Sequence, residues 1–190
     1  MSEPDRIISD MTAKLFEDLA DPQTVNSAAD NQWESSLWDG LEEVGLTRTW
    51  VPDALGGAGA SIRDGFEVLR VAGRFAVSVP LGETLLAGWM LPRAGIEIPP
   101  SGRMTVVAGP DLAIKDGAVT GAAPNIPFAS VAEHIVVVVD TPEGPQAGLV
   151  EPGECTVNSG ESLSREPRDT GTLAGVKPRG MAPKIGRAHV

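Results

Sequence analysis

Apolar residues in the first half of the chain recur at three- and four-residue steps, a period that predicts helices with one buried face. The first stripe runs over residues 7–19 and stops before Pro22, because proline disfavours the helical conformation in the residue that precedes it. Further stripes cover residues 33–44, 61–73 and 81–90. We therefore expect a small all-helical domain over residues 1–98.

The third stripe has recognisable start and stop residues. Ser61 and Asp64 have the spacing of a capping box, in which each side chain accepts a hydrogen bond from the backbone N–H of the other residue. Gly73 is expected to close the helix. The pattern predicts a buried face made of Ile62, Phe66, Leu69 and Ala72.

The second half of the chain changes to the pattern of short strands bounded by Gly, Pro and Asp. Val136–Val139 is a continuous β-branched run, which is typical of a strand buried on both faces. Close spacing and Asp-Gly and Pro-Glu-Gly turns predict antiparallel pairing in a sandwich or barrel. The expected strands are 104–108, 118–120, 134–140, 146–150 and 155–158.

These patterns predict an α+β protein, in which an all-α domain (1–98) precedes an antiparallel β-barrel or sandwich domain (103–176). The Pro- and Gly-containing stretch 96–102 is the expected link, and residues 177–190 are expected to form a loose tail. Residues 185–190 back-translate to DNA that resembles one reading frame of a sequencing adapter. We therefore expect this hexapeptide to be artefactual and the gene to be cut off there.

Composition and charge narrow the class of protein. The 190 residues are 42% hydrophobic and 22% charged, which is ordinary for a globular protein, and the net charge is -11. Nucleic acid and anionic membrane surfaces repel such an acidic chain. No signal peptide or membrane-spanning run is recognisable, so a cytoplasmic location is expected. One cysteine and two histidines make no typical metal site.

No nucleotide-binding, zinc-protease or serine-hydrolase motif occurs in the sequence. His134 opens the valine strand and is interpreted as an edge or domain-interface histidine. Cys155 lies in an acidic stretch, which disfavours a reactive thiolate, so we interpret it as inert. The carboxylates interpreted as solvated are Glu42, Glu43 and Asp53.

Residues 50–61 read Trp-Val-Pro-Asp-Ala-Leu-Gly-Gly-Ala-Gly-Ala-Ser, which on physical grounds predicts a tight interhelical loop. With the preceding run from Leu37, Leu-Trp-Asp-Gly-Leu-Glu-Glu-Val-Gly-Leu, the loop resembles the N-terminal domain of flavin-dependent acyl-CoA dehydrogenases. In that family a helix ending in glycine leads into V-P-E-x-x-G-G-x-G. The stretch 121–129, with Ala132-Glu133 and the valine strand, is similar to the middle-domain segment G-x-K-x-W-I-T-N-A followed by A-D and a strand. The resemblance extends to Asp169.

The resemblance implies FAD as cofactor and places Asn125, Ile126 and Pro127 at the flavin, aligned with the W-I-T triplet that packs on the flavin and donates hydrogen bonds to it. Pro127 departs from the pattern because proline has no backbone N–H. The family's T-E-P-x-x-G-S-D loop is absent or reduced to Ala108–Asp111. The catalytic glutamate belongs to a C-terminal helical domain that the chain does not reach, so no catalytic residue is predicted.

The resemblance therefore implies a fragment of an FAD-dependent oxidoreductase of fatty acid or lipid catabolism. The intact protein would dehydrogenate an acyl-CoA thioester at its α,β bond, with an electron-transfer partner and in a homo- or hetero-oligomer. This chain alone is expected to be inactive and not to retain FAD. Two alternatives stay open: a non-catalytic supporting subunit of a heteromeric dehydrogenase, and a non-enzymatic α+β assembly module.

Overall fold

The computed structural model describes residues 3–21, 32–76, 78–164 and 166–183. The chain divides into two compact units, Met1–Leu85 and Leu86–Val190. The division falls inside helix α5 (Leu81–Arg93), ahead of the stretch 96–102 that the sequence suggests as the link. Each unit is described by itself.

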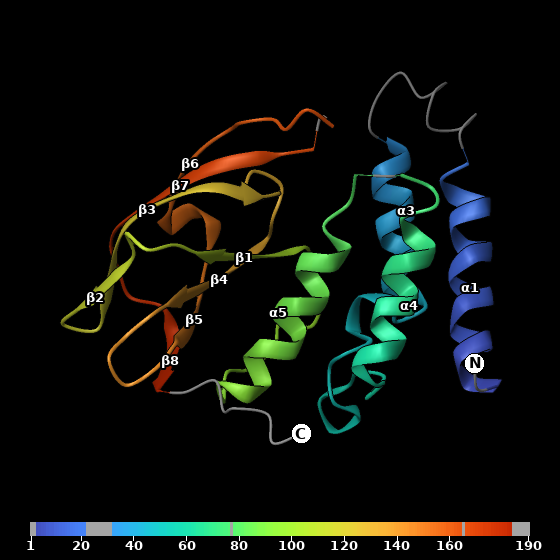
Figure 1. Cartoon of the computed structure of the whole chain (residues 1–190), viewed down its shortest axis with the longest axis horizontal. Coiled ribbons are helices and arrows are strands. Elements are labelled where there is room, and N and C mark those ends of the chain that lie inside the picture. Colours follow the sequence, from blue (N-terminus) through green and yellow to red (C-terminus); the bar gives the residue numbers. More distant parts are fainter. Residues whose placement is uncertain (1–2, 22–31, 77, 165, 184–190) are drawn as a thin grey trace. The chain divides into compact units, whose positions relative to one another are not determined.

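The first unit is helical (Figure 1). Phe16, Leu37 and Leu41 are fully buried in its core. Helix α3 approaches α1 closely at Gly40, where an added Cβ would lie 2.8 Å from Leu19 Cδ1. Its helices and 3-10 turns are α1 (Glu3–Leu19), α3 (Gln32–Glu43), η1 (Leu46–Arg48), η2 (Asp53–Leu55), α4 (Ile62–Ala72) and the start of α5.

Helix α4 begins at the predicted capping box but buries a different face. The Asp64 N–H donates to Ser61 Oγ at 3.2 Å, and the Ser61 N–H donates to Asp64 Oδ2 at 2.9 Å. The buried residues are Gly65, Val68 and Val71, whereas Ile62 is 45% and Phe66 58% exposed. The predicted face of Ile62, Phe66, Leu69 and Ala72 is therefore wrong at its first two positions.

The reason for the shifted face of α4 is Trp50. Its indole lies against Gly65, where an added Cβ would be 2.0 Å from Trp50 Nε1. Trp50 Nε1 donates to the Ile62 carbonyl at 3.3 Å, and the Phe66 ring packs edge-on against the indole with 5.4 Å between centroids. The absence of a side chain at Gly65 admits the indole, so the glycine marks the buried face.

The second unit contains a sandwich of two four-stranded sheets (Figure 1). One sheet has the order β1-β4-β5-β8 and the other β2-β3-β7-β6. The sheets do not close into a barrel, so the predicted α+β class is confirmed in its sandwich form. The strands are β1 (Met104–Ala108), β2 (Ala113–Lys115), β3 (Ala118–Pro127), β4 (His134–Val139), β5 (Gln146–Val150), β6 (Thr156–Asn158), β7 (Arg168–Val176) and β8 (Arg179–Pro183), with a 3-10 turn η3 (Pro152–Glu154).

The sandwich differs from the prediction in its strands and in their pairing. Strands β2 and β7 were not expected, and β3 continues to Pro127 instead of ending at residue 120. Strands β1 and β4 pair in parallel, while the other named pairs are antiparallel. The parallel pair forms because β2 and β3, which lie between β1 and β4 in sequence, belong to the opposite sheet. Strand β8 occupies residues 179–183, where a loose tail was expected, and bonds to the edge of β5. The adapter-like residues 185–190 lie outside the described part of the chain.

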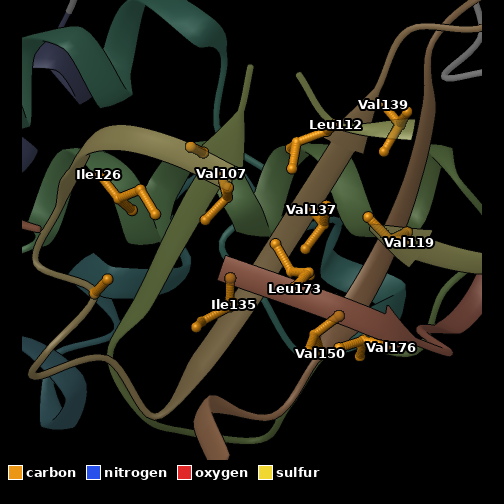
Figure 2. Close-up of a cluster of buried hydrophobic side chains, with 12 residues drawn as sticks. Val107, Leu112, Val119, Ile126, Ile135, Val137, Val139, Val150, Leu173 and Val176 are labelled. Atoms are coloured by element: carbon orange, nitrogen blue, oxygen red, sulfur yellow. The ribbon is translucent and has the colours of Figure 1, made fainter. Parts of the chain in front are cut away.

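The valine strand is buried on both faces, as its composition predicts. One face of β4 contributes Ile135, Val137 and Val139 to the core between the sheets. The other face places Val136 in a cluster with the later residues of α5, including Leu91. Figure 2 shows the inter-sheet core, whose labelled members are Val107, Leu112, Val119, Ile126, Ile135, Val137, Val139, Val150, Leu173 and Val176.

Candidate functional site

The three residues predicted to bind a cofactor form the end of β3, where the strand is irregular. Asn125 is exposed and has a left-handed backbone with φ 58°. The pairing of β3 with β7 shifts register between Ala123 and Ile126. Ile126 is only 4% exposed and its side chain belongs to the inter-sheet core (Figure 2). Only Asn125 and the half-buried Pro127 therefore offer side-chain surface to a ligand.

Pro127 has no backbone N–H to donate, and its carbonyl oxygen already accepts a hydrogen bond. Thr105 is fully buried on β1, and its Oγ1 donates to the Pro127 carbonyl at 2.5 Å. This bond ties the end of β3 to a strand of the opposite sheet. The missing N–H falls where the resemblance expects a threonine that bonds to the flavin.

The connection between β1 and β2 lies against β3 just before this site. Gly121 has φ 129°, and an added Cβ there would lie 2.1 Å from the Asp111 carbonyl oxygen. An added Cβ at Gly109 would lie 3.5 Å from Ala123 Cβ. The Ala108–Asp111 connection therefore lies against the part of β3 that precedes the 125–127 segment.

A buried carboxylate that the sequence analysis did not single out supports the same segment. Asp169 lies on β7 opposite Ile126 and is 0% exposed. Its Oδ2 accepts the Ser130 N–H at 2.7 Å, and its Oδ1 accepts the Gly160 N–H at 3.0 Å. Along β7 every second residue is buried, namely Asp169, Gly171 and Leu173. An aspartate at a position that this alternation assigns to the core is the sequence signal that could have identified it.

The two remaining candidate side chains, His134 and Cys155, have surroundings that fit structural roles. His134 Nδ1 lies 3.5 Å from Glu151 Oε2, and Glu151 Oε1 also pairs with Arg179. His134 and Arg179 line a pocket of about 210 Å³ together with Leu149. Burial and, to a lesser extent, the negative charge of Glu154 raise the pKa of the Cys155 thiol, which agrees with an inert cysteine.

The glycine loop uses its backbone polar groups internally. The Gly59 N–H donates to the Val51 carbonyl at 2.8 Å, and Arg48 donates to the carbonyls of Leu55 and Gly56 at 2.8 and 3.0 Å. An added Cβ at Gly57 would lie 2.2 Å from the Val51 oxygen. The loop is therefore a folded turn between helices, as its composition predicts on physical grounds. Glu43 and Asp53 are exposed.

Two further kinds of feature are absent from the residues that the structure describes. Among them no group of three or more His, Cys, Asp or Glu side chains is arranged to hold a metal ion. None of the helices in that part of the chain has the length and apolarity needed to cross a bilayer.

The amino-acid sequence is related to curated acyl-CoA dehydrogenases over part of its length. Acyl-CoA dehydrogenase IpdE2 of Mycolicibacterium smegmatis is 34% identical over 90 residues, which cover 46% of this chain and 29% of the relative. The protein of the same name from Mycobacterium tuberculosis is 35% identical over 88 residues, or 45% of this chain and 28% of the relative. The match thus spans less than a third of these relatives. No protein-family model matches the chain.

The fold is that of solved acyl-CoA dehydrogenases over nearly the whole chain. The Tcur3481–Tcur3483 steroid ACAD has a TM-score of 0.83 at 25% identity, over 96% of this chain and 58% of that one. The ChsE4–ChsE5 complex from Mycobacterium tuberculosis has a TM-score of 0.79 at 18% identity, over 96% and 57%. PigA, solved with FAD and proline, has a TM-score of 0.69 at 15% identity, over 96% and 58%. The last two show likeness of fold alone.

Proposed function

The chain is a relative of the acyl-CoA dehydrogenases, and we propose that it supplies the helical and β-sandwich parts of an FAD-dependent dehydrogenase. The observation that carries the proposal is the match of both units, in order, to one enzyme fold. In this assignment residues 1–98 are the N-terminal helical domain, and the β-sandwich, which includes β8 as well as residues 103–176, is part of the middle β-domain. The sequence match to IpdE2 argues against an unrelated assembly module.

The end of β3 fits the edge of a planar cofactor, although with fewer donors than the family motif. The exposed Asn125 amide has both a donor and an acceptor, and the half-buried Pro127 presents an apolar ring. Ile126 contributes backbone only, because its side chain is buried. When bound, FAD supplies the acceptor of hydride, and the protein supplies orientation and electrostatics.

The reaction of the whole enzyme is proposed as α,β-dehydrogenation of an acyl-CoA thioester in lipid catabolism. We assign no catalytic base to this chain, and we expect it to be inactive by itself. The relatives Tcur3481–Tcur3483 and ChsE4–ChsE5 are two-component proteins, which supports assembly with a second subunit. An electron-transfer partner follows from the reaction class, and a cytoplasmic location agrees with a single, unpaired cysteine.

The test of the cofactor proposal is a substitution that restores the missing donor. The chain is not expected to retain FAD through purification, but FAD fluorescence titrated with the full chain at high protein concentration should reveal weak, saturable binding. Pro127→Thr should tighten it roughly 2- to 12-fold, the effect of one hydrogen bond of about 0.5–1.5 kcal/mol. Pro124→Thr, a matched exchange at an exposed position of the same strand, should leave the affinity unchanged. If neither the chain nor Pro127→Thr binds FAD, the cofactor assignment is wrong.

A second candidate function is a supporting subunit without catalysis. It is favoured by Pro127, whose missing N–H and bonded carbonyl remove the flavin contact expected there. Thioester-dependent dye reduction by the chain together with a dehydrogenase partner separates the two functions. Loss of turnover when Asn125 is replaced by alanine supports a cofactor site in this chain, whereas unchanged turnover supports the supporting role.

A further inference from the structure

We propose that Asp169 is a positioning residue, whose buried carboxylate fixes the conformation of residues 125–129 and thereby the surface that Asn125 and Pro127 present. The role of this surface as a cofactor edge rests on the proposed function, but the positioning itself is a property of the described chain. Asp169 lies directly opposite Ile126 in the β3–β7 ladder, next to the register shift.

Backbone pairing alone holds this segment poorly. Pro124 and Pro127 have no N–H to donate to the ladder, and Asn125 and Phe128 have left-handed backbones with φ 58° and 55°. The first ladder-type bond after them, from the Phe128 N–H to the Pro167 carbonyl, is long at 3.3 Å. Non-glycine residues with positive φ persist only where their surroundings hold them in place.

The Asp169 carboxylate supplies the missing restraint. One oxygen accepts the Ser130 N–H at 2.7 Å, immediately after the segment, and the other accepts the Gly160 N–H at 3.0 Å, in the connection between β6 and β7. The Arg168 N–H donates back to the Gly160 carbonyl at 2.9 Å. The Asp169 side chain therefore holds both the turn after β3, at Ser130, and the connection between β6 and β7, at Gly160, to strand β7.

The chemistry requires a carboxylate at this position. A fully buried charge is costly unless it is hydrogen-bonded, and here each oxygen receives a charge-assisted bond from a backbone N–H. An asparagine of the same shape has only one acceptor oxygen, so its NH₂ group would face one of the two N–H donors. Gly160 adds a constraint of space, because an added Cβ there would lie 2.3 Å from the Arg168 carbonyl oxygen.

The experiment compares the full chain with Asp169→Asn and with Asp64→Asn as a matched control. Asp64 also accepts a backbone N–H, at the start of α4 in the other unit. Backbone NMR gives amide exchange rates and the Cα shifts that report left-handed φ. We expect Asp169→Asn to accelerate exchange at Ser130 or Gly160 at least tenfold. It should also move the Cα shifts of Asn125 and Phe128 toward extended values, while Asp64→Asn changes none of these.

An FAD titration of the same proteins adds a readout that a purely structural role would leave unchanged. If FAD binds, Asp169→Asn should weaken it at least fivefold at a temperature where all three proteins are folded. Unchanged shifts at Asn125 and Phe128 overturn the proposal, and so does an FAD affinity that stays the same while the shifts move. If no protein binds FAD, the proposed function fails, and the NMR shifts still decide whether Asp169 positions the segment.

Discussion

Single residues set the chemistry at the end of β3. Proline at 127 removes a donor, while a buried threonine occupies its carbonyl. The neighbouring Ile126 anchors the strand in the core, so the exposed amide of Asn125 is the main polar group that this edge offers. The carboxylate of Asp169, which lies opposite Ile126 on the neighbouring strand β7, then restrains the turn that follows. Recognition at this site therefore depends on very few atoms.

Cys155 provides a pH-dependent test at the same scale. Burial, together with the charge of Glu154, raises the pKa of the thiol, so less thiolate exists at any given pH than in free cysteine. The rate of alkylation by iodoacetamide should therefore rise with pH along a curve displaced to higher pH than that of the same thiol in the urea-unfolded chain. Glu154→Gln should move the curve part of the way back. An inflection at or below that of the unfolded chain would contradict this environment.

At the scale of elements, α4 shows how a neighbour selects the buried face. The helix has apolar residues on two adjacent faces, and the periodicity alone favours the one with the larger side chains. The Trp50 indole can lie against α4 only where the helix has no side chain, which is at Gly65. This contact places Val68 and Val71 on the buried face. The aromatic Phe66 then covers the edge of the indole and remains more than half exposed.

A pair of substitutions on α4 distinguishes the two faces. Val68→Ala should lower the free energy of unfolding by about 2 kcal/mol, because it removes buried methyl groups and leaves a cavity. Phe66→Ala should cost less than about 1 kcal/mol, since most of its side chain is already in water. Urea denaturation monitored by circular dichroism measures both. A larger loss for Phe66→Ala than for Val68→Ala would restore the face expected from periodicity.

At the scale of the molecule, the sandwich is completed by segments that are distant in sequence. The parallel pairing of β1 with β4 requires the β2–β3 excursion into the opposite sheet. Strand β8 covers the edge of β5 that β4 does not pair with. It fits closely there, since an added Cβ at Gly148 would lie 2.8 Å from the Met181 sulfur of β8. Edge strands left open are prone to pair with other chains, so β8 protects the sheet.

Two truncations test the role of β8 in the whole chain. Ending the chain after Pro178 should lower the thermal midpoint by several degrees and promote aggregation, because it removes the partner of β5. Ending it after Pro183 keeps β8 and removes only the adapter-like end with Lys184, so the midpoint should stay the same. Thermal unfolding and light scattering provide the readouts. Equal midpoints for the two truncated chains would show that β8 contributes nothing to stability.

The sequence by itself determined the features that depend on near neighbours. The helices, the capping box at Ser61, the β-branched strand at 136–139 and the family resemblance all depend on spacings of a few residues, and each was confirmed. The face of α4, the strands β2, β7 and β8, the parallel pair and the role of Asp169 were decided only by the tertiary structure. Each depends on a partner remote in sequence, whose approach fixes which side chain is buried and which backbone edge is free to pair.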